Sequence, residues 1–405
     1  MDRTELVELL SPTSLRLLDS LPPYDANGDV LKLVSELRKA GHAAGLVSAV
    51  LSQSRLRAKA VGKFGEFAQR MLFTEAGLEQ ATRLRVAALH AGRFAGLSAA
   101  LGRPPRVADL GCGIGGDAMA LAAIDLPVVA VDADEVTATV ASFNLAPFPN
   151  ASALQADAET VDLADFDAVW LDPARRTSGH SNTTRLTRSE DYSPSLDFAY
   201  LLASTLPLGM KLGPGHDRDQ IPVDAEAQWV SVDGQVVEMG LWFGALARAG
   251  IRRSALLLAK DGVHEMVASA DSDDAPVGEL GHYVYEPDGA VIRARLIGDL
   301  ARSMAARMLS EGIAYLTNDT LTPTPFASAF RVLEKLPFDE KKLRLALLER
   351  RIGTLEIKKR GVDVDPATLR TRLKLKGPES ATLILTRAGG QRMALLVERV
   401  RQPIV

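Results

Sequence analysis

Apolar side chains in the first part of the chain recur at the spacing of amphipathic helices. Between residues 30 and 37 they repeat at i, i+3, i+4 and i+7, with Asp29 as the candidate N-cap and Gly41 as the candidate stop. A proline pair at 22–23 separates this helix from an earlier leucine-rich one. We therefore expect a helical N-terminal domain over residues 1–75.

The pattern changes at residue 106, where short apolar runs begin to alternate with helical stretches. RVADL, VVAVD and FDAVWLD each have the length of a buried strand, and helical segments separate them. Strands spaced in this way form parallel βαβ units with helices on both faces of the sheet. The fold class expected for residues 76–280 is therefore α/β, a doubly wound Rossmann-like sheet, with Asp233-Gly234 as a hairpin turn.

The last part of the chain predicts a second, smaller α/β domain over residues 331–405. Its elements follow in the order β-α-β-α-β-β, with Asp339 and Asp365-Pro366 at the starts of the two helices. Residues 281–330 are ambiguous. We treat them as a connecting segment with a hairpin at 286–289 and a helix at 297–309.

The composition is that of an ordinary folded protein, with 47% hydrophobic and 24% charged residues among 405. The single cysteine excludes an internal disulfide and a cysteine-rich metal site. The first twenty residues mix acids with leucines, and no stretch has 18 uninterrupted apolar residues, so we expect a cytoplasmic protein without a membrane span. The net charge of −4 divides unevenly, because residues 331–405 carry +9 and the rest −13.

A glycine-rich turn follows the first predicted strand, in the segment RVADLGCGIGGDAMALA. Gly111, Gly113 and Gly115 let a ligand approach bare backbone, and the helix behind them offers N–H groups at its start. In this context the glycines indicate a nucleotide-type cofactor site, the alternative being a structural turn. Asp132 ends the second strand, where a carboxylate can accept both ribose hydroxyls of a dinucleotide or of S-adenosylmethionine.

Three further aspartates discriminate between a dinucleotide and S-adenosylmethionine as the cofactor. Asp109 stands two residues before the first glycine, Asp157 follows the third strand where it can accept from an adenine amino group, and Asp172 opens the D-P-A-R ending of the fourth. Together these residues resemble the class I S-adenosylmethionine-dependent methyltransferases, over roughly residues 70–265. The resemblance implies S-adenosyl-L-methionine as the cofactor.

Within that superfamily, Asp172-Pro173 resembles the D-P-P-[YFW] motif of enzymes that methylate exocyclic amino groups, including the RNA cap guanine-N2 methyltransferase group. The segment FTEAGLEQAT is similar to the one that closes over the cofactor in this group. That similarity implies that Thr74, Gln80 and Ala81 line the methionine side. An ordinary amphipathic helix start is the alternative interpretation of this segment.

Methyl transfer from a sulfonium is an in-line displacement, in which the protein positions the acceptor and excludes water without needing a metal. Asp172 and the Pro173 carbonyl can accept the two N–H groups of a target amine. Arg175 stands where the family has an aromatic residue, and its guanidinium can stack on a base or pair with phosphate. Cys112 lies inside the glycine turn, which disfavours the nucleophilic cysteine route of pyrimidine C5 methylation.

Trp170 lies on the same predicted strand as Asp172, and we expect its side chain to be part of the hydrophobic core.

Two basic stretches are candidate contacts to a polyanion. The polar segment 177–194 follows the catalytic strand, and we expect Arg176, which precedes it, and Arg185 and Arg188 within it to bind substrate phosphates, a solvated loop being the alternative. In the last domain a second cluster comprises Lys358, Lys359, Arg360, Arg370, Arg372, Lys374 and Lys376. A solvated helix face is the alternative for this cluster.

Residues 331–402 resemble the THUMP-like domain that follows uncharacterised bacterial class I methyltransferase domains. Similar THUMP domains deliver structured RNA, notably tRNA, to attached modification enzymes. The sequence thus predicts a methyltransferase acting on a base exocyclic amine or ring nitrogen of RNA such as tRNA or rRNA, with no membrane or metal partner. The alternatives are a catalytically silent RNA-binding protein, a protein or small-molecule methyltransferase, and an NAD-dependent oxidoreductase.

Overall fold

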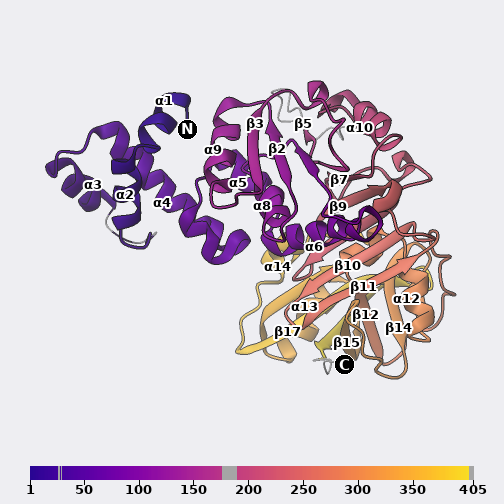
Figure 1. Cartoon of the computed structure of the whole chain (residues 1–405). Helices are drawn as coiled ribbons and strands as arrows, with labels where there is room; N and C mark the ends of the chain where they lie inside the picture. Colours follow the sequence, from indigo (N-terminus) through magenta and orange to yellow (C-terminus); the bar gives the residue numbers. More distant parts are fainter. Residues whose placement is uncertain (26–27, 29, 176–188, 401–405) are drawn as a thin grey trace. The chain divides into compact units, whose positions relative to one another are not determined.

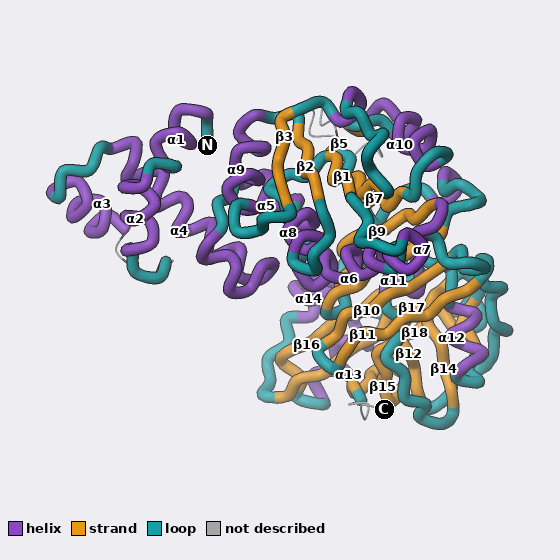
Figure 2. Tube along the Cα trace, viewed as in Figure 1, coloured by secondary structure: helices purple, strands orange, loops and turns teal. Residues whose placement is uncertain are grey.

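The computed structural model describes residues 1–25, 28, 30–175 and 189–400. The chain forms two compact units, which Figures 1 and 2 show. Unit 1 comprises Met1–Leu212 and Leu241–Arg248, and unit 2 comprises Gly213–Gly240 and Ala249–Val405. Neither unit is a continuous stretch of sequence, so this division differs from the linear series of domains that we expected.

Unit 1 begins with helices, as the colouring of Figure 2 makes clear. In chain order they are α1 (Arg3–Leu9), α2 (Pro12–Ser20), α3 (Val30–Lys39), α4 (Ala44–Phe64) and the 3-10 helix η1 (Gly65–Arg70). Asp2 and Glu5 form a reciprocal capping box at the start of α1, and Ser11 caps α2. The expected helical N-terminal region is confirmed, although the proposed cap of α3, Asp29, lies outside the described residues.

The remainder of unit 1 is built on parallel strands in the order β7-β4-β1-β2-β3, with β9 next to β7. The strands are β1 (Val107–Leu110), β2 (Val128–Asp132), β3 (Ala151–Gln155), β4 (Ala168–Leu171), β7 (Leu208–Leu212) and β9 (Gln235–Phe243), beside the short pair β5 (Ala174–Arg175) and β6 (Tyr192–Ser193). Their registers pair β1 with β2 and β4, β2 with β3, and β4 with β7, all in parallel. The C-terminal ends of β7, β4, β1, β2 and β3 therefore share one edge of the sheet, and the expected Rossmann-like fold is confirmed.

Helices flank these strands. They are α5 (Glu75–Gln80), α6 (Leu84–Ala95), α7 (Ser98–Leu101), α8 (Gly116–Ala122), α9 (Glu135–Leu145) and α10 (Leu196–Ala203), with the 3-10 turns η2 (Ala158–Thr160), η3 (Ser189–Asp191) and η5 (Gly244–Leu246). Helices α8 and α9 pack on β2 and β3, as Figure 1 shows, and α10 packs on β7.

Two tryptophans mark the centre of the unit 1 core. Trp170 of β4 and Trp242 of β9 are buried, with ring centroids 5.5 Å apart. A Cβ atom at Gly209 of β7 would lie 2.6 Å from the Trp242 ring and 2.8 Å from the Trp170 ring, so glycine is required there by close packing. The prediction that Trp170 is a core residue is confirmed.

Unit 2 contains the hairpin predicted at Asp233-Gly234. Strands β8 (Glu226–Val232) and β9 flank this turn, and both turn residues have positive φ, as a type I′ turn requires. The 3-10 helix η4 (Arg218–Gln220) precedes β8, and β10 (Arg253–Ala259) and β11 (Gly262–Ala268) follow β9. The order of these strands in the sheet is β11-β10-β8-β9.

The other sheet of unit 2 has seven strands in the described part of the chain, in the order β13-β14-β12-β15-β18-β17-β16. Its strands are β12 (Tyr283–Pro287), β13 (Arg307–Ser310), β14 (Ile313–Asn318), β15 (Ala327–Leu336), β16 (Ile352–Lys359), β17 (Glu379–Ala388) and β18 (Gln391–Arg399). The helices are α11 (Gly289–Arg293), α12 (Ile297–Ser303), α13 (Glu340–Glu349) and α14 (Pro366–Leu373). From β15 onward the predicted order β-α-β-α-β-β is confirmed, and Asp339 and Asp365 cap the two helices as expected.

Alternate residues of β17 belong to two different hydrophobic cores. Leu383 and Leu385 join the core that includes the apolar side chains of α13 and α14. Ile384 joins the core that includes Tyr315 and Phe330. Because successive strand residues point to opposite faces, both faces of the sheet are buried along this strand.

We expected residues 281–330 to form a connecting segment. Instead they contribute β12, β13, β14 and the start of β15 to this sheet, together with α11 and α12. Asp288 caps α11 by accepting from the Ala290 N–H at 2.8 Å, so the hairpin predicted at 286–289 is wrong. The helix predicted to reach residue 309 ends at Ser303, and β13 begins at Arg307.

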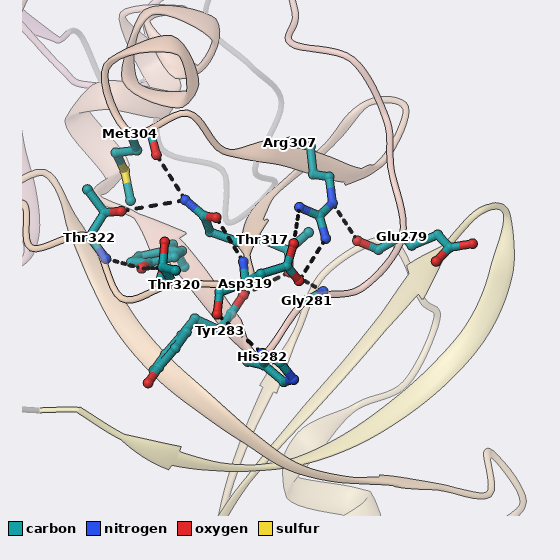
Figure 3. A network of polar contacts seen from close by, with 12 residues as sticks. Glu279, Gly281, His282, Tyr283, Met304, Arg307, Thr317, Asp319, Thr320 and Thr322 are labelled. Carbon is teal, nitrogen blue, oxygen red and sulfur yellow. Dashed lines mark hydrogen bonds and ion pairs between the residues drawn. The ribbon is translucent and has the colours of Figure 1, made fainter.

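A polar network stabilises this region (Figure 3). Arg307 donates to both carboxylate oxygens of Asp319 at 3.1 and 3.2 Å and to the Glu279 carbonyl at 2.7 Å. The Thr317 hydroxyl donates to the Tyr283 carbonyl at 2.8 Å. These contacts connect the ends of β12, β13 and β14.

Among the described residues, no helix is long and apolar enough to cross a membrane.

Candidate active site

A pocket of about 320 Å³ lies at the C-terminal ends of β1, β2 and β4. In open parallel sheets this edge is where ligands bind. The lining comes from the turn after β1, the ends of β2 and β4, the turn after β3, and α5. It includes Thr74, Gln80, Ala81, Thr82, Gly111, Gly113, Asp117, Asp132, Asp157 and Asp172.

The glycine turn exposes backbone to this pocket. Gly111 and Gly113 have φ of +77° and +55°, in the left-handed region that favours glycine. A Cβ atom at Gly111 would lie 2.6 Å from the Asp172 carbonyl oxygen, whereas one at Gly113 would meet no atom within 4 Å. Gly111 is therefore required by packing against β4, and Gly113 leaves space on the pocket side for a ligand.

Asp132 at the end of β2 is oriented by two backbone amides. Its Oδ2 accepts from the Gly113 N–H at 3.1 Å and its Oδ1 from the Asp134 N–H at 3.0 Å. Burial raises the pKa of Asp132, although these two hydrogen bonds oppose the rise. Each carboxylate oxygen has more than one lone pair, so the oriented group can accept two further hydroxyls.

Asp157 lies on the same side of the pocket after β3. Its side chain is exposed and caps η2 by accepting from the Glu159 N–H at 3.0 Å. Asp157 lines the pocket, and its contact with an adenine amino group stays a prediction.

The segment before α6 closes the pocket from another side. Thr74 caps α5, and its hydroxyl accepts from the Gly77 N–H at 3.0 Å. A Cβ atom at Gly77 would lie 2.5 Å from the Ile114 side chain, so α5 packs directly on the glycine turn. Thr74, Gln80 and Ala81 all line the pocket, and their contact with the methionine side stays a prediction.

Lys63 of α4, which the sequence analysis did not identify, holds the end of α5. Its Nζ donates to the carbonyls of Leu78, Glu79 and Ala81 at 2.9, 2.7 and 2.7 Å. Burial, followed by the nearby charge of Lys211, lowers the pKa of Lys63 to about 8.

Lys211 is a second functional candidate that the sequence analysis missed. It lies on β7, the parallel neighbour of β4, and its ammonium forms an ion pair with Asp172. The same Nζ donates to the Gln80 carbonyl and the Thr82 hydroxyl, both at 3.2 Å. One lysine thus connects β4 with α5 and the residues after it. The sequence feature that could have identified Lys211 is a charged residue inside the otherwise apolar strand segment LGMKL.

Asp117 at the start of α8 is a buried acid on the pocket wall. Burial acts to raise the pKa of Asp117, but the hydrogen bond with His90, together with the Lys211 charge and a hydrogen bond with Thr82, leaves it below its usual value. The His90 Nδ1 lies 2.9 Å from the Asp117 Oδ1, and its ring centroid lies 4.3 Å from that of Trp170. The sequence did not predict this network, because a single histidine on a helix has no partner at a recognisable sequence spacing.

The structure places Asp109, Gly115 and Pro173 next to the lining residues rather than among them. Asp109 is 1% exposed, and neither of its carboxylate oxygens has a hydrogen-bond partner among the described residues. Burial, and then the charges of Asp117 and Asp172, raise the pKa of Asp109 well above its usual value. Gly115 precedes α8, and Pro173 is buried.

The predicted arginine contacts are only partly within the described residues. Arg175 lies on β5 opposite Tyr192 of β6. Arg176, Arg185 and Arg188 lie outside the described residues.

Cys112 lines the pocket but has the properties of an unreactive thiol. Burial, followed by the charges of Asp109 and Asp132, raises the pKa of Cys112 well above its usual value, which disfavours a nucleophilic thiolate. In the part of the chain that the structure describes, no three His, Cys, Asp or Glu residues gather as ligands for a metal ion.

The three basic residues predicted to bind substrate in unit 2 have different surroundings. Lys358 is 20% exposed and forms ion pairs with Glu286 at 2.7 Å and Glu356 at 3.7 Å. Lys359 is exposed. The Arg360 guanidinium lies 5.5 Å from the centre of the Tyr315 ring.

Known proteins show which family has this arrangement. Over 360 residues, the chain is 34% identical to an uncharacterised S-adenosylmethionine-dependent methyltransferase found in two Mycobacterium tuberculosis strains, CDC 1551 and H37Rv. The similarity covers 86% of this chain and 95% of the relative. This chain belongs to the S-adenosylmethionine-dependent methyltransferases. The cofactor of the methyltransferase is S-adenosyl-L-methionine, which decides between the two cofactors that Asp132 left open.

Separate parts of the methyltransferase match three family models. Residues 107–182 match a methyltransferase domain, residues 327–399 a THUMP domain-like family, and residues 2–60 a domain of unknown function. A solved structure of a proposed methyltransferase from Porphyromonas gingivalis W83 covers 99% of this chain and 100% of its own, with 19% identity and a TM-score of 0.75. That structure shares the fold, and the expected resemblances to class I methyltransferases and to THUMP-like domains are confirmed.

The pocket fits the cofactor of this methyltransferase. The bare backbone at Gly111 and Gly113 admits the ligand where a side chain would fill the space. Asp132, held by two backbone amides, would accept the ribose hydroxyls, and Thr74, Gln80 and Ala81 would hold the methionine side. When bound, the cofactor supplies the electrophilic methyl group on its sulfonium.

Proposed function

We propose that this methyltransferase modifies RNA, transferring the methyl group to a base nitrogen of a structured RNA such as tRNA or rRNA. The observation that carries the proposal is the combination, in one chain, of a THUMP-like match over residues 327–399 and an Asp-Pro pair at the end of β4. A protein or small-molecule acceptor leaves the THUMP-like part of the chain without a role.

In this proposal the target nitrogen is positioned by Asp172 and the Pro173 carbonyl, which accept its N–H groups. Proline fixes the backbone φ immediately after the carboxylate, so the two acceptors keep one geometry. Lys211 holds the Asp172 carboxylate in place through the ion pair. A base nitrogen held in this way presents its lone pair along one direction, as in-line methyl transfer requires.

RNA contacts are expected on the exposed basic residues of the THUMP-like part. Lys359, Arg370, Lys374 and Lys376 are exposed, whereas Lys358 is partly buried in its ion pairs. α14 ends at Leu373, and Lys374 adopts a left-handed φ of 45° that ends the helix. This surface supplies the cationic contacts to phosphate that position a nucleic acid.

The substrate class is tested by comparing modified nucleosides between a deletion strain and its parent by mass spectrometry. RNA from the deletion strain should then accept labelled methyl groups from S-adenosylmethionine when the purified enzyme is added. Asp172→Asn should retain cofactor binding and lose transfer by at least a hundredfold. If no nucleoside changes, and label enters protein or small molecules instead of RNA, the proposal is wrong.

The role of the basic surface is tested with two variants of equal charge change in unit 2. Lys374→Glu/Lys376→Glu should weaken RNA binding at least tenfold at physiological salt and reduce its salt dependence. Lys335→Glu/Arg387→Glu, at exposed positions on β15 and β17, should remain within about twofold of the wild type. Equal losses in both variants would indicate binding through overall charge rather than through this surface.

A further inference from the structure

A second pocket, of about 510 Å³, lies in unit 2 and is not part of the cofactor site. Its charged lining residues are Arg218, Arg293, Arg295, Arg360 and Asp274. Four arginines and one aspartate give this lining a formal charge of +3. We call it the arginine pocket.

The four arginines come from three distant parts of the sequence. Arg218 begins η4, Arg293 ends α11, Arg295 follows it, and Arg360 comes directly after β16. The hairpin formed by β13 and β14 contributes uncharged lining through Met308, Gly312 and Ala314. Because like charges brought together in one pocket repel, this arrangement is unfavourable unless an anion compensates for it.

The contacts of the arginines leave most of their charge uncompensated. Arg293 donates from Nη1 to the neutral Pro214 carbonyl at 2.8 Å. In the described part of the chain, Arg295 has one ion pair within 4 Å, in which its Nε lies 3.9 Å from an Asp271 oxygen. Among the described residues, Arg360 has the Tyr315 ring as a neighbour and no ion pair within 4 Å.

Two guanidinium nitrogens in the pocket lack acceptors. The Nη1 of Arg218 and the Nε of Arg360 are buried, and neither has a hydrogen-bond partner among the described residues. Buried N–H groups of a charged side chain are unfavourable without an acceptor. Both side chains line the arginine pocket, so the unmet hydrogen-bonding capacity lies in its wall.

The backbone at Arg295 supports a constrained site. Its φ is +59°, in the left-handed region where arginine is uncommon, and its carbonyl accepts from the Ser272 N–H at 2.9 Å. Such conformations persist where the surrounding structure enforces them, and they concentrate at binding sites. The strained backbone adds a second observation, independent of charge, at the same pocket.

We propose that the arginine pocket binds the phosphate group of a phosphorylated ligand. Guanidinium groups present planar pairs of N–H donors that match phosphate oxygens, and several of them around one pocket favour a dianion over a single carboxylate. The volume lies in the range of small-ligand pockets, roughly 300–1,000 Å³, so a sugar phosphate or the phosphate of one nucleotide fits. The phosphate belongs either to RNA or to a small phosphorylated molecule. The proposal does not depend on the RNA acceptor proposed above.

The first test measures binding of inorganic phosphate to the full-length protein, with chloride as the reference at constant ionic strength. Phosphate should raise the melting temperature saturably in the wild type. Arg218→Gln and Arg360→Gln should each weaken phosphate binding at least tenfold by calorimetry. Arg331→Gln, an exposed arginine paired with Glu398 outside the pocket, should change nothing. A phosphate effect equal to that of chloride, or one unaltered by both pocket variants, overturns the proposal.

Variants that fail to fold are recognised by far-UV circular dichroism and by loss of cofactor binding, which reports on unit 1. For these, Arg218→Lys and Arg360→Lys keep the charge but remove the planar fork. The lysine variants should fold and still bind phosphate several-fold more weakly than the wild type. Unchanged phosphate affinity in folded lysine variants also overturns the proposal.

A second arm distinguishes the two sources of the phosphate. Ribose 5-phosphate is compared with ribose, and binding of the RNA from the deletion strain is measured in the same variants. If Arg218→Gln and Arg360→Gln weaken RNA as much as inorganic phosphate, the ligand is an RNA phosphate. If RNA binding is unchanged and the preference for ribose 5-phosphate over ribose is lost, the ligand is a small phosphorylated molecule. Phosphate binding without any RNA methylation would refute only the proposed function.

Discussion

Lys211 and Asp172 form an ion pair at the ends of two adjacent parallel strands, β7 and β4. The two side chains are 12% and 27% exposed, so solvent screens their charges only weakly. Breaking a partly buried pair on one side leaves the remaining charge with less compensation, which costs more than removing both partners. The pair therefore determines how the Asp172 carboxylate is held.

Replacing Lys211 should cost more than replacing both partners. Lys211→Met should lower the free energy of unfolding of the cofactor-free protein by about 1–3 kcal/mol, because Asp172 loses its counter-charge. Lys211→Met/Asp172→Asn should recover at least half of this loss. Urea denaturation of both variants and of the Asp172→Asn single variant checks this expectation. A double variant less stable than Lys211→Met would contradict it.

Asp132 should contribute strongly to cofactor affinity. Asp132→Ala removes the carboxylate oriented by Gly113 and Asp134, and hydrogen bonds to a charged group contribute about 1.5–3 kcal/mol each. Calorimetry with S-adenosylmethionine should therefore show a dissociation constant raised at least tenfold. Asp165→Ala is the matched control, since Asp165 is 88% exposed with only a 4.0 Å ion pair to Arg106. Wild-type affinity in Asp132→Ala would remove Asp132 from the cofactor site.

Two glycines of the same turn should respond differently to alanine. In Gly111→Ala the new Cβ meets the Asp172 carbonyl, and left-handed φ adds about 1–2 kcal/mol of strain, so both folding stability and cofactor binding should fall. In Gly113→Ala only the strain applies, and cofactor binding should fall with a smaller loss of melting temperature. Thermal melts and calorimetry on both variants provide the measurement. Equal losses of stability would show that the Gly111 contact with β4 is not decisive.

Asp109 should make the stability of the cofactor-free protein depend on pH. Its pKa is raised in the folded state, mainly by burial, so the folded protein retains this proton to higher pH than the unfolded chain. Stability is therefore lost as pH rises from the ordinary value of 3.8 through the raised pKa. Asp109→Asn lacks this loss, and its stability advantage over the wild type should grow as pH increases. Denaturation curves between about pH 4 and pH 8 test this, and a constant difference would contradict it.

Much of the site was predictable because a parallel βαβ fold repeats one local rule. Residues at the C-terminal ends of successive strands share an edge, which brings Gly111, Asp132, Asp157 and Asp172 to one pocket. Lys211 and His90 were not predictable in this way. Their roles depend on the position of β7 next to β4 and of α6 against α8, and these are tertiary relationships without local spacing.

The errors in residues 281–330 have a chemical origin. The Pro287-Asp288-Gly289 sequence suits a turn, but the same aspartate carboxylate suits a helix N-cap, and in the structure it caps α11. Local residue preferences do not distinguish these two uses. Similarly, glycine after a helical stretch is a common helix stop, yet Gly353 lies inside β16, where a Cβ atom would be 2.0 Å from the Gly377 carbonyl oxygen.

The chain passes from one unit to the other after Leu212, Gly240 and Arg248. These crossings limit how segments of this protein can be exchanged with those of a relative to make a chimera. β9 contributes its first six residues to unit 2 and its last three to unit 1. One crossover with a relative cannot exchange the catalytic part as a cassette, because any single breakpoint leaves one hydrophobic core assembled from two parents. A chimera that keeps both cores intact needs breakpoints at all of these junctions.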